Sequence, residues 1–260
     1  MITVLQILVV LLFIVILIVV VFKPRKNASY HLPDHYKDLL QDYVSFYTSL
    51  NEEDQKHFLQ RLEKFYAAVK ITGVNAEVED LDRVLVGAAA IISVFYIKDW
   101  EYVHLKEVLV YPGNFNVDFD QAGNNRSVLG MVGTGALQNV MILSKWELRQ
   151  NFISPGSTRN TAIHEFAHLV DKMDGTFDGV PEILLTRKYI PQWNFLMTNL
   201  IEKIARGETD IDLYAATNQV ECFAVICEYY FMQQQQFNKQ YPEIGRMLQQ
   251  VFRVPANDHN

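Results

Sequence analysis

A short motif in the middle of the chain, His164-Glu165-Phe166-Ala167-His168, combines residue types that bind metals and move protons. No glycine or proline interrupts residues 161–173, so we expect a helix here. On a helix, His164 and His168 project from one face about 6 Å apart, where both imidazoles can reach one Zn²⁺ at about 2.0–2.1 Å. Glu165 lies about 100° further round the helix, where it can take a proton from a zinc-bound water. This arrangement is typical of zinc metalloproteases.

A catalytic zinc site needs a third protein ligand and leaves one position open. The candidates are the acidic or histidine residues Asp171, Asp174, Glu221, Glu228 and His259. We expect Asp171 to hold a histidine N–H rather than to ligate, because it lies two helical turns beyond His164. Glu221 opens an apolar helix over residues 221–232, where a carboxylate needs a partner. Glu228 lies on the same helix and is its rival.

The alternative for the motif is a surface helix with two solvated histidines. Its neighbours are mainly apolar: Ile163, Phe166, Ala167, Leu169 and Val170. Such a helix is expected to be buried. Burying two histidines and a glutamate without a partner would cost on the order of a few kcal/mol of folding free energy, unless something coordinates or pairs them. The pattern therefore favours a metal site.

The elements that position these residues follow from hydrophobic periodicity. We predict a helix over residues 36–50, a second helix after the cap Asn51 running to Val69, and a break at residues 72–74. Residues 81–96 are apolar nearly all round, which indicates a buried central helix. Ser157 or Thr158 is expected to cap the motif helix.

The pattern changes to short strands between the early and late helices. The strand candidates are residues 103–110, 117–119, 128–132 and 140–143, separated by turn residues. From Ser144 onward the chain is predicted to be helical again. Helices, then a sheet, then helices indicate an α+β fold rather than a doubly wound one.

The N-terminus is predicted to anchor the chain in a membrane. Residues 1–22 are almost entirely apolar, and as a helix they would span about 33 Å, enough for a hydrocarbon core of about 30 Å. A cleaved signal peptide is the alternative, but no basic residue precedes the run. The basic linker of residues 23–33 favours a single span in the plasma (inner) membrane with the globular body in the cytoplasm.

Charge and cysteine content exclude several classes of protein. The formal net charge is −7, and without Lys23, Arg25 and Lys26 the chain has 20 basic against 30 acidic residues. Such an anionic body repels phosphate backbones, so we expect no nucleic-acid partner. Cys222 and Cys227 are too few for a disulfide scaffold and are expected to pack in the core.

Two blocks of sequence resemble the Mlc titration factor A family of glucose-regulated zinc metallopeptidases. The first is residues 164–171 followed by Asp174-Gly175, and the second is residues 214–231, which includes Tyr-Ala-Ala-Thr and Glu-Cys-Phe-Ala-Val. Weaker matches at residues 108–115 and 142–146 extend the resemblance over about residues 33–254. We therefore expect one metallopeptidase domain over residues 34–254, followed by a tail of residues 255–260.

The resemblance implies a site as well as a fold. It makes His164, His168 and Glu221 the ligands of one zinc ion and Glu165 the general base. Tyr214 would face the cleft, where its hydroxyl could donate to the oxyanion. The implied fold is a zincin, in which a mixed sheet packs on the active-site helix and an edge strand lines the substrate cleft.

The resulting expectation is a membrane-tethered zinc peptidase that hydrolyses peptide or protein substrates, and the resemblance implies aminopeptidase-like cleavage. The alternative is a zinc-containing regulatory module that sequesters a protein partner, such as a transcriptional regulator, without hydrolysis. A zinc hydrolase acting on lipid head groups is a third reading. An intact Glu165 favours the peptidase, because a structural zinc site needs no general base.

Overall fold

A computed structural model describes residues 30–113, 130–132, 139–154 and 156–255. The predicted anchor of residues 1–22, most of the basic linker and most of the tail lie outside these residues, as do the strand candidate 117–119 and the ligand candidate His259. Within the described ranges, every helix is too short or too polar to cross a membrane.

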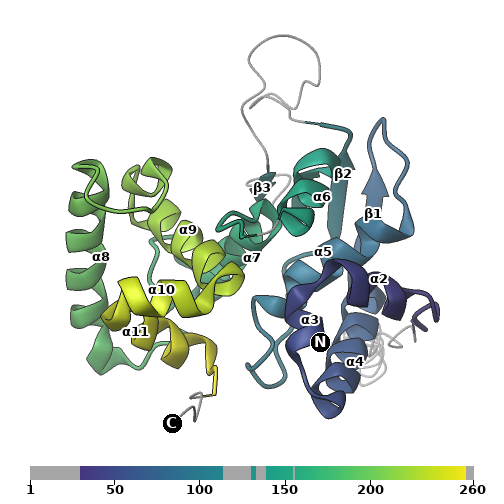
Figure 1. Ribbon diagram of the computed structural model, residues 1–260, viewed down its shortest axis with the longest axis horizontal. Coiled ribbons are helices and arrows are strands. Elements are labelled where there is room, and N and C mark those ends of the chain that lie inside the picture. The colour runs from purple at the N-terminus through teal and green to yellow at the C-terminus, as the bar shows by residue number, and fades with distance from the viewer. Residues whose placement is uncertain (1–29, 114–129, 133–138, 155, 256–260) are drawn as a thin grey trace, which may run out of the picture.

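The N-terminal helices form one side of the molecule (Figure 1). The predicted helix of residues 36–50 is two helices, α2 (Tyr36–Tyr43) and α3 (Ser45–Ser49), because Val44 is extended between them. The bend lets Val44 and Tyr47 both face the core. Helix α4 (Glu52–Ala68) begins at Asn51, whose side chain accepts a hydrogen bond from the Asp54 N–H, as predicted.

Helix α5 (Asp80–Ile92) confirms the predicted buried central helix, since every residue from Val84 to Ile92 is buried. It ends four residues earlier than expected. The guanidinium of Arg61, itself buried, donates hydrogen bonds to the carbonyls of Val94, Phe95 and Ile97, which follow the helix. Buried carbonyls without a partner would cost free energy, so this arginine stabilises the turn that ends α5.

The sheet is mixed and has the order β1-β2-β4-β3. Strands β1 (Lys70–Gly73), β2 (Glu107–Tyr111) and β4 (Val140–Ser144) are parallel, whereas β3 (Gly130–Val132) is an antiparallel edge strand. Strand β1 was not predicted, because only Ile71 of its four residues is buried and no alternation marks it. Strand β2 begins four residues later than expected. Strand β4 is confirmed.

Alternate residues of the central strands face opposite sides of the sheet, as the pleat requires. Val108, Val110, Met141 and Leu143 join the main core, while Ile142 belongs to a small cluster on the other face. On the core side, α5 packs against α7 (Thr161–Asp171), and α7 contacts β3 and β4. The sheet therefore supports the helix that contains the His-Glu-Phe-Ala-His motif.

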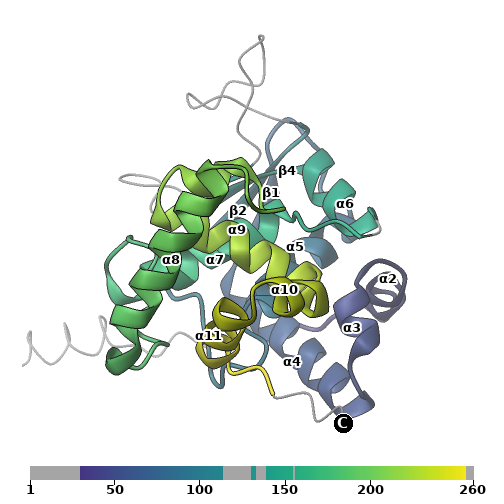
Figure 2. The same ribbon diagram turned by 60° about the vertical axis from the view of Figure 1, so that its left-hand side comes forward.

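The C-terminal helices form the other side, with α7 between the two groups (Figure 1). They are α8 (Ile190–Ala205), α9 (Gln219–Met232), α10 (Gln234–Gln240) and α11 (Pro242–Phe252). Helix α6 (Lys145–Ile153) lies between β4 and α7 in the chain. The described residues also form the short 3₁₀ helices η2 (Lys172–Asp174), η3 (Arg187–Tyr189) and η4 (Leu213–Ala216). Figure 2 shows α8 in front of α7 and α9. The mixed sheet and helical majority confirm the α+β class.

Candidate metal centre

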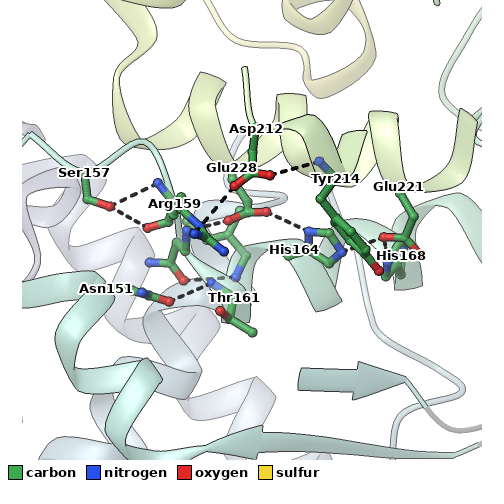
Figure 3. A network of polar contacts seen from close by, with 12 residues as sticks. Asn151, Ser157, Arg159, Thr161, His164, His168, Asp212, Tyr214, Glu221 and Glu228 are labelled. Atoms are coloured by element: carbon green, nitrogen blue, oxygen red, sulfur yellow. Dashed lines mark hydrogen bonds and ion pairs between the residues drawn. The ribbon is translucent and has the colours of Figure 1, made fainter. Parts of the chain in front are cut away.

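Helices α7 and α9 bring the three predicted metal ligands together. His164 and His168 come from α7, and Glu221 comes from the first turn of α9 (Figure 3). Glu221 Oε2 lies 3.0 Å from His164 Nε2 and 3.4 Å from His168 Nε2. One ligand atom of each residue lies within 4.8 Å of the others.

These spacings fit a tetrahedral metal ion. Two ligands that each lie about 2.0–2.1 Å from a tetrahedral Zn²⁺ are about 3.3 Å apart. The two distances to the carboxylate are close to that value. The donor set of two imidazoles and one carboxylate also matches the three protein ligands of catalytic zinc sites that keep one position open. The residues present therefore fit a metal ion.

Glu228, the predicted rival of Glu221, does not lie with the ligands. Its Oε1 lies 2.6 Å from His164 Nδ1, and its Oε2 accepts a hydrogen bond from the Asn160 N–H at 2.6 Å. A carboxylate can only accept, so Nδ1 provides the proton and Nε2 is left to face the ligand cluster. Glu228 thus fixes the orientation and tautomer of His164, which is the usual role of a carboxylate behind a metal-binding histidine.

The charges around the cluster favour a cation. Burial alone would lower the pKa of His164, but the carboxylates of Glu221 and Glu228 raise it to about 10. Burial would raise the pKa of Glu221, and its hydrogen bonds to His164 and His168 outweigh that effect and hold it well below its usual range. Without a metal the site therefore holds a proton on His164, and a cation must displace it.

Glu165 lies on the same helix as the two histidines, but it does not belong to the group of metal ligands. Its side chain is buried, and burial raises the pKa of its carboxyl group above the usual range. Strand β3 closes over it, since a Cβ added to Gly130 would lie 2.8 Å from Glu165 Oε1. The edge strand thus lies against the predicted general base.

Tyr214 lies beside His164, in η4. Its ring centre is 6.1 Å from that of His164, and 53% of the residue is exposed. Burial of its hydroxyl and the nearby Glu221 carboxylate raise the pKa of Tyr214 to about 12. Asp212 accepts a hydrogen bond from the Tyr214 N–H and forms an ion pair with Arg159 at 3.5 Å, which ties η4 to the chain before α7 (Figure 3).

Asp171 does not make the histidine contact predicted for it. It is fully buried, but its Oδ2 accepts a hydrogen bond from the Gly179 N–H at 2.9 Å, and its Oδ1 has no hydrogen-bond partner. His168 Nδ1 is also buried without a partner. Asp174 does not belong to the ligand group of His164, His168 and Glu221, and its two oxygens accept hydrogen bonds from Thr176 and Glu182.

Asn160 is a residue that sequence reasoning missed. It caps α7 in place of the predicted Ser157 or Thr158, accepting a hydrogen bond from the Ile163 N–H. The asparagine immediately before the motif helix was the available signal, since asparagine is a preferred cap. Its own N–H is held by Glu228, so the start of α7 and the orientation of His164 depend on the same carboxylate.

Comparison with known proteins places the chain in a family. The model of the glucose-regulated metallopeptidase M90 family matches residues 21–253. This chain belongs to that family. The M90 chain is 30% identical over 219 residues to Mlc titration factor A of Escherichia fergusonii, covering 78% of this chain and 80% of the relative. It is 25% identical over 241 residues to an uncharacterized protein of Synechocystis sp., covering 85% and 84% of the two chains.

Family and geometry agree on the kind of site. Membership of a metallopeptidase family implies a metal ion, and His164, His168 and Glu221 of the M90 chain lie together as a possible site for one. Both ligand-bearing helices lie inside the matched residues.

Proposed function

We propose that this chain is a zinc-dependent peptidase with His164, His168 and Glu221 as the metal ligands. The observation that supports it best is that Glu221 Oε2 lies 3.0 and 3.4 Å from the Nε2 atoms of His164 and His168. A buried glutamate that is not a ligand, Glu165, lies on the same helix as the histidines. Bound zinc would supply Lewis-acid polarisation of the scissile carbonyl and a nucleophile at neutral pH.

Glu165 is the proposed general base and acid. Its carboxylate takes the proton of the attacking water and returns a proton to the leaving amine. Burial raises the pKa of this carboxyl group toward neutral pH, which suits both roles. The carboxylate becomes a stronger base toward the attacking water, and its protonated form persists closer to neutral pH, where it can protonate the leaving amine.

Tyr214 is proposed to stabilise the oxyanion. Its pKa, raised from the ordinary value to about 12, lies far above neutral pH. The hydroxyl is therefore protonated and can donate a hydrogen bond to the developing negative charge. Strand β3 is the edge strand of the sheet in the described residues and lies beside Glu165, and an extended peptide could pair with it. We also propose that the enzyme cleaves peptides in the manner of an aminopeptidase.

The decisive experiment compares the wild type with Glu165→Gln. We expect both proteins to hold one zinc ion by elemental analysis, while hydrolysis of a peptide mixture falls by at least about 10²-fold in the variant. His164→Ala serves as the control that loses the metal as well. Near-normal hydrolysis by Glu165→Gln would refute the mechanism.

A second candidate comes from the name of the relatives. Mlc titration factor A denotes a protein that titrates Mlc, which favours a role in which this chain holds a regulatory protein partner. The same variant separates the two functions: partner capture should survive Glu165→Gln, whereas peptide hydrolysis should not.

Residues 1–22 are proposed to anchor the domain in the plasma membrane, with the site on the cytoplasmic side. The support is their apolar run and the basic residues that follow it. The full chain should stay with membranes through alkaline extraction, and a version lacking residues 1–26 should not. Release of the full chain by alkali would exclude a spanning helix.

A further inference from the structure

Two half-exposed aromatic rings flank the metal ligands. Phe177 lies beside His168, with ring centres 5.2 Å apart and planes at 70°, and 49% of the residue is exposed. Tyr214 lies beside His164. Since Tyr214 has a proposed chemical role and Phe177 has none, the position of Phe177 needs its own explanation.

The loop that presents Phe177 is held by its own hydrogen bonds. Asp174 Oδ1 accepts from the N–H and the hydroxyl of Thr176, at 2.9 and 2.6 Å. Asp171 accepts from the Gly179 N–H, and the Trp193 indole N–H donates to the Gly179 carbonyl at 2.8 Å. The residues on both sides of Phe177 are therefore fixed.

The loop is also locked against the helix that supplies the third ligand. Gly179 has a φ of +78°, and a Cβ there would lie 2.4 Å from the carbonyl oxygen of Gln219 in the first turn of α9. Only glycine allows both the conformation and this close approach. Phe177 thus has a fixed position relative to both His168 and Glu221.

An exposed phenylalanine on a rigid loop leaves apolar area in water that folding alone does not bury. Ordering such a ring beforehand lowers the entropy cost of binding a ligand against it. The ring centre lies at most about 9 Å from a metal held by His168, since the Zn–N distance is about 2.0–2.1 Å. A side chain attached next to the scissile carbonyl can reach this far, because one residue spans about 3.3–3.6 Å and an aromatic side chain extends further.

We propose that Phe177 forms the wall of an apolar subsite that selects an aromatic or large aliphatic side chain beside the scissile bond. The subsite rests on the proposed peptidase function, because it deepens the specificity of that same centre. Contact with Phe177 would bury apolar area on both partners, and the free energy of binding becomes more favourable roughly in proportion to the apolar area removed from water.

Binding to an inert protein tests the subsite independently of turnover. The zinc-loaded Glu165→Gln protein is titrated by calorimetry with matched short peptides in which each position in turn is Phe, Leu or Ala. With Phe177 present, we expect Phe and Leu at one position to lower Kd about tenfold relative to Ala, which corresponds to about 1.4 kcal/mol. In Phe177→Ala this preference should fall to about twofold or less, and Phe177→Leu should retain most of it.

Phe195→Ala is the matched control, since Phe195 is exposed on α8 and contacts no metal ligand among the described residues. It should keep the full preference. An undiminished preference in Phe177→Ala, or no preference when Phe177 is present, would overturn the subsite. A uniform loss of affinity for all peptides would make Phe177 a cover for His168 instead, and would also overturn it. Failure of the peptidase proposal appears separately, as absence of hydrolysis by the wild type despite selective binding.

Discussion

The contact between Gly130 and Glu165 offers a sharp test of how strand β3 positions the proposed base. A Cβ at residue 130 would lie 2.8 Å from Glu165 Cγ, from Glu165 Oε1 and from Thr161 Cγ2. Carbon atoms in favourable contact are about 3.5–4.0 Å apart. Gly130→Ala must therefore move either the edge strand or the Glu165 carboxylate by about 1 Å.

Both movements have measurable costs. Overpacking of this size destabilises by about 1–3 kcal/mol, offset by about 0.4–1 kcal/mol because alanine restricts the unfolded chain. Displacement of a catalytic group by about 1 Å can lower turnover about 10²-fold. Metal content should not change, because the three atoms nearest the added methyl group belong to Glu165 and Thr161 and not to the metal ligands.

Urea unfolding, zinc analysis and peptide turnover are measured together on Gly130→Ala and on Gly113→Ala. Gly113 follows strand β2, and a Cβ there meets no atom within 4 Å, so its variant should match the wild type. If Gly130→Ala keeps turnover within about twofold of the wild type, β3 does not constrain the base, and the reasoning is wrong.

Three further predictions concern the metal ligands and the oxyanion. Glu228→Gln should lower zinc affinity about 10–100-fold, because the carboxylate that holds His164 Nδ1 loses its charge. Competition with a chromophoric chelator measures this, and a variant with the affinity of the wild type would exclude a positioning role for Glu228. Zinc affinity of the wild type should rise by about tenfold per pH unit between about pH 6 and 8, because the metal displaces a proton from His164, whose pKa is raised to about 10. As pH falls, a smaller fraction of His164 is free of its proton, so the zinc affinity must weaken toward acid pH. A zinc affinity that does not change with pH would contradict this. Tyr214→Phe should lower kcat about 10²-fold or more at unchanged metal content, whereas an unchanged kcat would assign the hydroxyl no part in the reaction.

Local sequence was enough to predict the start of α4, the buried helix α5 and the paired histidines. The four-residue spacing of His164 and His168 places both rings on one face of any helix that contains them, and their ring centres lie 4.6 Å apart in the structure. The cap Asn51 and the apolar run of α5 were equally local. Strand β1 was missed because it exists through its pairing with β2, and its short, half-exposed sequence contains little strand signal.

The third ligand was a question that spacing alone could not answer. Glu221 and Glu228 lie on one helix, two turns and about 10 Å apart along its axis, and both are available as carboxylates near His164. Packing of α9 across α7 decides between them: Glu221 meets the Nε2 atoms of both histidines, while Glu228 meets Nδ1 of His164.

The same division holds for the base and the subsite. The sequence by itself determined that a glutamate follows the first histidine, and that a helix would turn it away from the metal-facing side. Only the tertiary structure brought Gly130 of the edge strand against that glutamate and fixed Phe177 beside His168. Helical periodicity acts over a few residues and can be read from the chain, whereas contacts between α7, α9, β3 and the loop after α7 depend on how separate elements pack.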